Sequence, residues 1–381
     1  MAKYTGDIPP VAHAELIHSV IQRVATGPEL SKNISYDEAR SVSNALLEGS
    51  MDPVQAAVFL IGLRMKRETD PELQGLLDAL NDKTTHITAQ PDDVIVLSDP
   101  YNGFNRTLHA SLFVLPVLAA CGVSAYSHGV ELCGPKFGVT HHQIIKALGG
   151  NPLESMDKVA DRLADNSVGW GYADQSIFCK PLSDLIPLRT KIIKRPALST
   201  TEVMLTPVTG QQRTHLVTGY VHKPYREIYA MLARHLNLDS LLLIRGTEGG
   251  VIPSFKAKAH FVRYQGNSDA EEHDVDLEPI DLNRNYRAED IPETMPTAGK
   301  SDHIGTKWDN KALAKMCADK GIAALQGEPG AIYDAAVLGS GLIMWHIGKA
   351  ASLKEATDAA RQAISSGEAL QRLHAGLGTD H

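Results

Sequence analysis

Residues 93–149 alternate short apolar runs with polar loops, and this alternation limits the fold more than any other feature of the chain. The apolar run Val94–Leu97 ends in the turn-forming segment Ser98–Gly103 and is followed by the apolar segment Leu108–Ala120. A second apolar run, at 123–126, ends in another polar segment. The order of strand, loop, helix and strand predicts an α/β fold built on an open sheet.

The loops of this stretch are expected to form the ligand site. In an open α/β sheet the ligand crevice lies beyond the carboxyl ends of the strands. The loop at 98–107 and the loop at 127–138 follow the first two expected strands, and a third loop, at 245–250, follows a strand expected at 241–244. We therefore expect these three loops to lie together at one edge of the sheet.

The chain opens with four predicted helices. Their ranges are 11–25, 39–47, 54–65 and 72–80. A capping-box order at Ser35–Glu38 and an Asp-Pro pair before each of the last two helices mark their starts. We divide the chain into a helical domain at 1–88 and an α/β domain at 89–381. Short connections leave apolar helix faces that need a partner, so we expect a homodimer through this end.

Composition narrows the functional classes. The formal net charge of −8 over 381 residues lacks the basic excess of a dedicated nucleic-acid binder. The four cysteines are far apart, which argues against a zinc site or a disulfide framework. The N-terminus has no apolar leader, and Leu112–Val123, the longest apolar run, is too short to span a bilayer. We expect a cytoplasmic protein without a membrane segment.

The remainder of the chain continues the α/β pattern. We expect helices at 156–164, 181–193, 225–236, 311–319, 334–350, 353–364 and 368–375, and extended segments at 168–177, 214–219 and 257–264. The segment 266–290 is polar and acidic, and we expect an irregular, solvated loop there. Lys180–Arg195 is basic, which indicates either an anion-binding face or a solvated helix surface.

Both ends of the chain resemble one family. Ile34–Leu80 and Asp334–Leu373 are similar to the helical-domain signature and the last helices of the anthranilate phosphoribosyltransferases of glycosyltransferase family 3. The resemblance extends over nearly the whole chain. It implies the fold of the anthranilate phosphoribosyltransferase and nucleoside phosphorylase type, α/β with a separate α-helical domain that dimerises. It also implies loops that bind phosphoribosyl pyrophosphate (PRPP) and Mg²⁺.

Several motifs of that family are altered in this chain. Its glycine-rich turn G-T-G-G-D corresponds to Ile95–Asp99, where side chains replace the bare backbone amides that approach the pyrophosphate. Its K-H-G-N-R corresponds to Ser127–Glu131, which places an acid where the diphosphate needs cations. Its acidic, Mg²⁺-binding pair corresponds to Val251–Ile252. The resemblance implies Mg²⁺ as a cofactor, but the acidic ligand pair that the family uses is lost. The sequence therefore leaves undecided whether this protein uses Mg²⁺.

The candidate ligand residues come from the three loops and one arginine that the resemblance places near the acceptor. They are Asp99, Asn102, Gly103, Asn105, Arg106, Thr107, His109, His128, Gly129, Lys136, Arg189, Thr247 and Glu248. For His109, a structural role is the alternative to ligand binding. For Glu131 and Glu248, the alternative to a role in the site is helix capping or a salt bridge. His141-His142 shows no third ligand at metal spacing, so no metal site and no catalytic residue are assigned.

Three functions are compatible with these features. The first is a glycosyl or phosphoribosyl transferase with a changed donor or acceptor and little or no anthranilate phosphoribosyltransferase activity. It takes a small phosphorylated ligand. The second is a non-catalytic nucleic-acid-binding homodimer, in which Lys180–Arg195 of two subunits line a basic groove. The third is tryptophan-biosynthetic anthranilate phosphoribosyl transfer itself.

Overall fold

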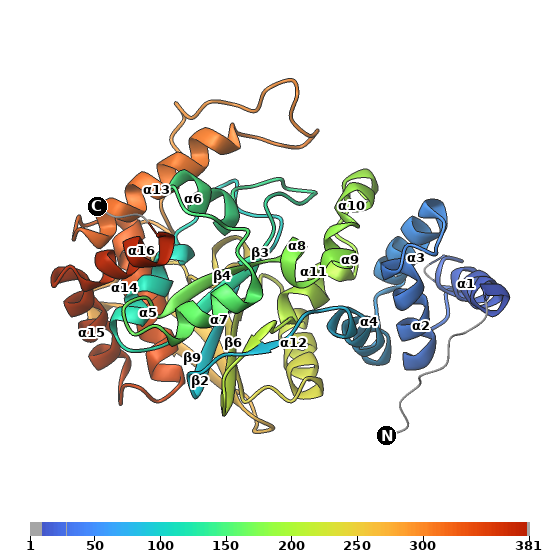
Figure 1. The fold of residues 1–381 in the computed structure, drawn as a ribbon, viewed down its shortest axis with the longest axis horizontal. Helices are drawn as coiled ribbons and strands as arrows, with labels where there is room; N and C mark the ends of the chain where they lie inside the picture. Colours follow the sequence, from blue (N-terminus) through green and yellow to red (C-terminus); the bar gives the residue numbers. More distant parts are fainter. Residues whose placement is uncertain (1–9, 28, 379–381) are drawn as a thin grey trace. The chain divides into compact units, whose positions relative to one another are not determined.

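The computed structural model describes residues 10–27 and 29–378, which form two compact units (Figure 1). The helical unit consists of the described residues up to Thr84 and of Cys179–Leu205. The α/β unit consists of Thr85–Phe178 and the described residues from Thr206 onward. The helical unit thus includes Cys179–Leu205, which the predicted boundary at residue 88 assigns to the α/β domain.

The helical unit begins with the four helices that the sequence predicts. They are α1 (Pro10–Val24), α2 (Tyr36–Leu47), α3 (Pro53–Lys66) and α4 (Asp70–Asp82). The capping box before α2 is present, because the Ser35 hydroxyl accepts the Glu38 N–H while the Glu38 carboxylate accepts the Ser35 N–H. The Asp52 carboxylate caps α3 by accepting from the N–H of Val54. Local sequence signals therefore set these helix starts.

The second part of the helical unit is broken into short helices. These are α9 (Lys180–Ser183), α10 (Ile186–Ile192), α11 (Leu198–Thr201) and the 3₁₀ turn η2 (Glu202–Met204). The single helix predicted at 181–193 is therefore wrong. Pro181 and Pro187 each lie in the first turn of a separate helix, the position that tolerates a residue without an N–H. Helix α10 packs on α3 and α11 packs on α4, which explains why this distant segment joins the first four helices.

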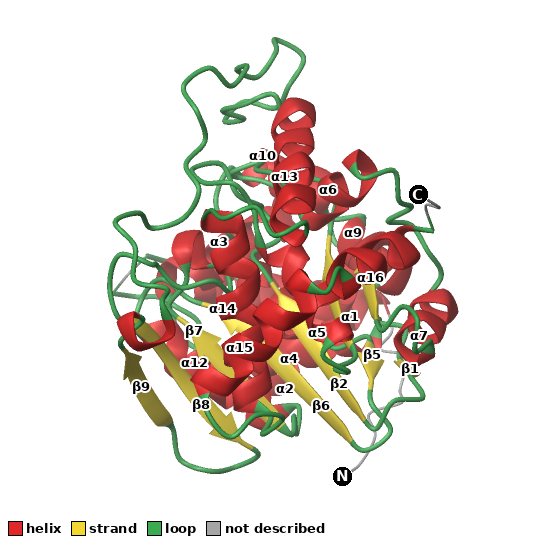
Figure 2. Cartoon of the chain, turned by 90° about the vertical axis from the view of Figure 1, so that its left-hand side faces the viewer, coloured by secondary structure: helices red, strands yellow, loops and turns green. Residues whose placement is uncertain are grey.

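The α/β unit is built on one seven-stranded mixed sheet, shown in Figure 2. In sheet order its strands are β4 (Trp170–Asp174), β3 (Ala125–Gly129), β2 (Asp93–Ser98), β6 (Arg213–Gly219), β7 (Ser240–Ile244), β8 (Ala259–Gln265) and β9 (Glu271–Val275). The first five are parallel and the last two are antiparallel to their neighbours. Two short strands, β1 (Ile87–Thr88) and β5 (Val208–Thr209), pair separately. The predicted α/β class is confirmed.

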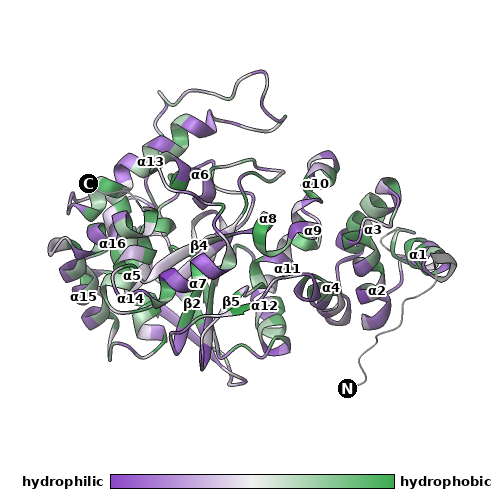
Figure 3. Cartoon of the chain, viewed as in Figure 1, coloured by the Kyte–Doolittle hydropathy of each residue, from purple (hydrophilic) through white to green (hydrophobic). Residues whose placement is uncertain are grey.

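Helices cover both faces of this sheet. One face carries α5 (Val114–Ala120), α14 (Ala331–His346) and α15 (Leu353–Ser365), and the opposite face carries α12 (Pro224–His235) (Figures 1 and 2). The remaining helices of the unit are α6 (His141–Ala147), α7 (Met156–Ala164), α8 (Gln175–Phe178), α13 (Asn310–Leu325) and α16 (Glu368–Leu377). Helix α14 is mostly hydrophobic (Figure 3) because it packs against α5, α13 and α15 at once.

Two further sequence expectations need correction. The segment 266–290 contains strand β9, which pairs with β8 at the edge of the sheet. Four of its five side chains are polar and three are exposed, so no hydrophobic alternation marked it as a strand. The helix predicted at 108–120 begins later, with the 3₁₀ turn η1 (Ser111–Phe113) before α5, so His109 precedes the helix. Among the described residues, no helix combines the length and the apolar character that a membrane span needs.

Candidate functional site

The site lies where the strand order of the sheet changes direction. From β2 the chain adds β3 and β4 on one side, and β6 and β7 follow on the other side of β2. In open α/β sheets such a switch point opens a crevice at the carboxyl ends of the strands. Asp99 directly follows β2 at this point, and the Thr218 hydroxyl of β6 donates to the carbonyl of Ser98, 2.8 Å away.

The first two predicted loops are joined by backbone hydrogen bonds. The N–H of Phe104 donates to the carbonyl of Val139 at 2.9 Å, and the N–H of Val139 donates back at 2.8 Å. Gly103 makes this approach possible, because a Cβ there would lie 2.4 Å from the carbonyl oxygen of Gly138 and its φ is +70°. The expectation that these loops share one edge of the sheet is met.

The third loop reaches the other two through the carboxylate of Glu248. One oxygen accepts the backbone N–H groups of Arg106 and Thr107 at 2.8 and 2.9 Å and the Thr107 hydroxyl at 3.2 Å. The other accepts the N–H of Asn105 at 3.4 Å and lies 2.5 Å from the Lys136 ammonium. We call these donors, from Asn105, Arg106, Thr107 and Lys136, the anion cradle. The Glu248 side chain is only 4% exposed.

The electrostatics of Glu248 match this set of donors. Burial acts to raise the pKa of Glu248, but the charge of Lys136 and the N–H groups of Arg106 and Thr107 outweigh burial and lower it. Glu248 has a φ of +55°, which is uncommon for a residue with a side chain. Such strained residues concentrate at functional sites. The carboxylate is therefore ionised, and its hydrogen bonds and the ion pair with Lys136 hold it in the cradle.

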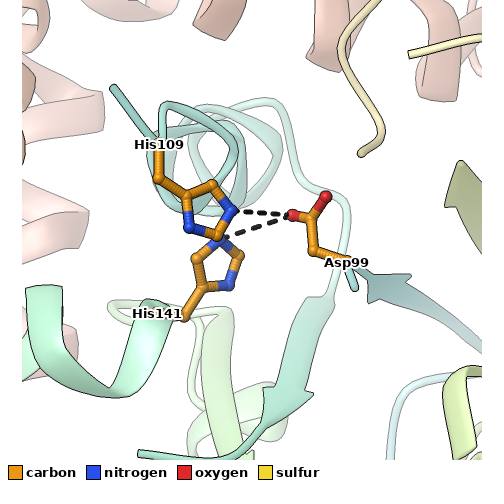
Figure 4. A group of neighbouring side chains, drawn as sticks. All are labelled: Asp99, His109 and His141. Carbon is orange, nitrogen blue, oxygen red and sulfur yellow. Dashed lines mark hydrogen bonds and ion pairs between the residues drawn. The ribbon is translucent and has the colours of Figure 1, made fainter. Parts of the chain in front are cut away.

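A second buried group lies beside the end of β2 (Figure 4). Asp99 Oδ2 lies 3.2 Å from His109 Nε2 and 3.6 Å from His141 Nε2, and it accepts the hydroxyl of Ser111. Asp99 Oδ1 accepts the N–H of Val251 at 3.1 Å. The rings of His109 and His141 are stacked with their centroids 4.4 Å apart. We call Asp99, His109, Ser111 and His141 the Asp99 cluster.

Hydrogen-bond partners define the charges in this cluster. His109 Nδ1 lies 3.2 Å from the carbonyl of Val139 while its Nε2 lies 3.2 Å from Asp99 Oδ2, so both ring nitrogens face acceptor oxygens. Burial raises the pKa of Asp99, but the hydrogen bond and charge of His109 and the contacts with His141 and Ser111 hold it at about 2. Burial, and then the charge of His109, lowers the pKa of His141 to about 3. The cluster thus contains an ionised Asp99 carboxylate beside a neutral His141 imidazole.

A small cavity adjoins the cluster. Its volume is about 20 Å³, and Asp99, His109, Ser111, Thr247 and Glu289 contribute to its walls. A cavity needs roughly 10–15 Å³ to hold one water molecule, so this one has room for a single water or ion. Of these lining residues, Thr247 and Glu289 are half-buried.

The other candidate residues have varied positions. The Tyr101 hydroxyl is hydrogen-bonded to His128 Nδ1, and both side chains are buried. Asn102 is buried and its carbonyl accepts the N–H of Gly138 at 2.9 Å. Gly129 ends β3, and the Arg106 side chain is exposed.

Arg189, the remaining candidate, belongs to the helical unit. Its guanidinium forms two hydrogen bonds with the Glu202 carboxylate, of 2.6 and 2.7 Å, and its side chain is 2% exposed. Lys180 is likewise paired, with Asp184 at 2.6 Å. Lys180 is thus paired with a carboxylate inside the basic segment, and Arg189 with one that follows it.

The structure also shows where the residues of the altered family motifs lie. Val251 is buried and Ile252 lines the small cavity, so the pair that stands in for the family's acidic ligands is apolar. Glu131 is exposed and lies 2.8 Å from the Lys146 ammonium. The sequence interpretation missed Ser111 and His141. The only available signal for His141 was the adjacent histidine pair, because its neighbours come from other parts of the chain.

The arrangement of the α/β unit, a parallel sheet with two antiparallel edge strands and three loops at one end, is that of a class of transferases known from solved structures. An anthranilate phosphoribosyltransferase from Thermus thermophilus matches with a TM-score of 0.71 and 19% identity over 95% of this chain and 98% of that one. The enzyme from Saccharomyces cerevisiae in complex with PRPP and Mg matches with a TM-score of 0.73 and 14% identity, covering 96% and 97% of the two chains. The fold is that of the anthranilate phosphoribosyltransferases.

Sequence comparisons agree with the fold. Residues 18–84 match the glycosyl transferase family, helical bundle domain. The chain is 25% identical over 355 residues to an anthranilate phosphoribosyltransferase of Rhodopseudomonas palustris (strain BisA53), covering 93% of this chain and 95% of the relative. It is 29% identical over 222 residues to an uncharacterized protein of Aquifex aeolicus, covering 58% and 65%. The chain is thus similar to the anthranilate phosphoribosyltransferases over almost its whole length, and its first helices match the helical bundle domain of the glycosyl transferase family.

Proposed function

We propose that this protein is a glycosyl or phosphoribosyl transferase with an altered donor site, in which a small phosphorylated ligand binds the anion cradle in place of the Glu248 carboxylate. One observation carries the proposal: three consecutive backbone N–H groups, the Thr107 hydroxyl and the Lys136 ammonium all converge on one anionic group. Convergent backbone amides with a lysine are the donor set that proteins use for phosphate. The similar enzyme from Saccharomyces cerevisiae is known in complex with PRPP, so we propose a phosphorylated sugar as the chemical class of the ligand.

We also propose that anthranilate phosphoribosyl transfer is absent or very weak. A donor phosphate has to displace a carboxylate that already satisfies the cradle, and a phosphate close to Glu248 is repelled. The apolar Val251 and Ile252 offer no carboxylate to Mg²⁺, so Mg²⁺ arrives only with the phosphates of the ligand. Robust formation of phosphoribosyl anthranilate by the purified protein is the outcome that contradicts this part of the proposal.

The test compares ligand binding in two variants with opposite effects. Calorimetry and thermal shift are run with pyrophosphate, PRPP with and without Mg²⁺, and a panel of nucleotides. Glu248→Gln removes the competing charge, and we expect affinity for the preferred compound to rise about tenfold, equivalent to about 1.4 kcal/mol. Lys136→Met removes a donor, so affinity should fall. Glu48→Gln, which removes a lysine-paired carboxylate of the helical unit outside the three loops, is the matched control and should change little.

The binding proposal fails if no phosphorylated compound stabilises either the wild type or Glu248→Gln. Nucleic-acid binding is the alternative, and the exposed cations Lys191, Lys194 and Arg195 are the observation that favours it. Short DNA and RNA strands are therefore included in the same screen. A true complex with nucleic acid weakens steeply as salt is raised, because counterions are released on binding.

We propose in addition that the helical unit forms a homodimer through α3. Phe59, Leu60 and Leu63 on one face of this helix are buried. Val54, Val58 and Met65 lie on another face, with exposed fractions of 71%, 37% and 74%. Their spacing of four and seven residues places them in one stripe, and a helix with a second apolar face needs a second surface to cover it. A second copy of the same helix is self-complementary to this stripe.

The cysteines fit the proposed cytoplasmic location. None of the four, all of which lie in the described part of the chain, forms a disulfide. Burial raises the pKa of Cys317 to about 12 and of Cys121 to about 11, so both remain thiols at neutral pH. Unreactive thiols of this kind are typical of reducing compartments.

A further inference from the structure

We propose that Asp99, His109 and His141 form a binding site for one divalent transition-metal ion, with zinc as its best occupant (Figure 4). The three residues come from the end of β2, the segment before η1 and the first turn of α6. All three are buried, and one ligand atom from each lies within 4.8 Å of the others. The inference is independent of the anion cradle and of any phosphorylated ligand.

The spacing of the ligand atoms suits a metal centre. Asp99 Oδ2 lies 3.2 Å from His109 Nε2 and 3.6 Å from His141 Nε2. Zinc binds nitrogen and oxygen at about 2.0–2.2 Å, so two ligands of a tetrahedral site are roughly 3.3–3.5 Å apart. Both measured distances lie within a few tenths of an ångström of that separation. An ion therefore fits with small side-chain movements.

Each ligand also has its outer atom held by the surrounding protein. His109 Nδ1 lies 3.2 Å from the carbonyl of Val139, and His141 Nδ1 lies 2.8 Å from the hydroxyl of Ser127. Asp99 Oδ1 accepts the N–H of Val251. Metal-binding histidines almost always donate their second nitrogen to such a group, which fixes the ring and directs the other nitrogen at the metal.

The chemistry of these donors selects the metal. Two imidazoles and one carboxylate suit zinc and its neighbours in the first transition series, whereas Mg²⁺ prefers a shell of oxygen atoms. Without a metal, the Ser111 hydroxyl is hydrogen-bonded to both Asp99 and His141, and His109 Nε2 is hydrogen-bonded to Asp99 directly. The adjoining cavity of about 20 Å³ has room for the water that completes three-ligand zinc sites.

The experiment uses the full, tag-free chain and the metal alone, without phosphorylated ligands. Zn²⁺ uptake is measured by elemental analysis after gel filtration, and Co²⁺ uptake is followed by its visible absorption. We expect one ion per chain, a tetrahedral Co²⁺ spectrum and no displacement by excess Mg²⁺. Asp99→Asn and His141→Asn should each weaken binding by more than about tenfold. A wild-type chain that takes up no stoichiometric Zn²⁺ or Co²⁺ overturns the proposal.

Two further variants separate metal binding from a merely structural role. His346 is a matched control, because it is also a buried histidine bonded to a serine, with its Nε2 2.9 Å from Ser240 Oγ. His346→Asn should keep the metal. Ser111→Ala removes the hydroxyl that competes for Asp99 and His141, so it should bind the metal at least as tightly as the wild type. Equal uptake by wild type, Asp99→Asn and His141→Asn would place the ion elsewhere and contradict the assignment.

Discussion

Lys136 and Glu248 lie 112 residues apart in sequence, yet the ammonium of Lys136 lies 2.5 Å from the Glu248 carboxylate. The same carboxylate accepts the N–H groups of Arg106 and Thr107. The Glu248 carboxylate therefore connects all three loops, and it satisfies the donors of the anion cradle without a ligand. Any ligand that uses these donors must separate Lys136 from Glu248, which couples binding to a movement of the third loop.

Gly103 should be the position most sensitive to a small side chain in these loops. Its φ is +70°, and an added Cβ would lie 2.4 Å from the carbonyl oxygen of Gly138. Gly49 has nearly the same φ, +69°, but nothing lies within 4 Å of an added Cβ. We expect Gly49→Ala to lower the free energy of unfolding by about 1–2 kcal/mol. Gly103→Ala should lower it further and weaken ligand binding. If urea denaturation shows the same loss of unfolding free energy for Gly49→Ala and Gly103→Ala, the close contact between Gly103 and Gly138 contributes little to stability.

Arg189 should be essential to stability rather than to ligand binding. Its guanidinium and the Glu202 carboxylate are both 2% exposed and form two hydrogen bonds. Arg189→Met leaves a buried carboxylate without its partner, and we expect a loss of about 3–5 kcal/mol in the free energy of unfolding. The double variant Arg189→Met, Glu202→Leu should recover much of that loss. Unchanged stability in the single variant, with weakened ligand binding, would instead support the sequence-based assignment of Arg189 to the ligand site.

The sequence predicted the features that depend on local signals. The capping box at Ser35 and Glu38 fixed the start of α2, and the apolar run at Val94–Leu97 identified β2. The placement of Asp99 and Glu248 in loops that follow strands was predicted from the apolar runs before them. Strand β9 was not predicted, because it is mostly polar and lies at the edge of the sheet. Its hydrogen bonds with β8, rather than hydrophobic burial, make it a strand.

Contacts between distant residues could not be predicted in the same way. His141 has no spacing relation to Asp99 or His109, since three separate elements bring them together. Glu248 was a candidate ligand residue with a capping or salt-bridge role as its alternative, but nothing in the sequence identified the three backbone N–H groups that it accepts. The sequence specifies side chains, whereas backbone donors become visible only when the loops are folded.

Acid should destabilise the protein through His346, whose ordinary pKa is near 6.5. Burial, and then the charges of Arg263 and His215, lowers its pKa to about 3 in the folded state. Between these values the unfolded chain binds a proton that the folded chain does not, so stability falls as pH falls. The slope is about 1.4 kcal/mol per pH unit for one proton. Between about pH 6 and 4.5, urea denaturation of His346→Asn should show a slope shallower by nearly that amount, and an unchanged slope would contradict it.

The apolar stripe of α3 should control the oligomeric state. Val54 and Met65 are 71% and 74% exposed, and a buried charge at either position destabilises an apolar interface. We expect light scattering after gel filtration to give twice 41.2 kDa for the wild type. The variant Val54→Lys, Met65→Lys should give the monomer mass. Gln55→Lys adds a charge at an exposed position outside the stripe and should leave the dimer intact. A wild type that stays monomeric at micromolar concentration, or a double variant that still dimerises, would show that this stripe serves another contact.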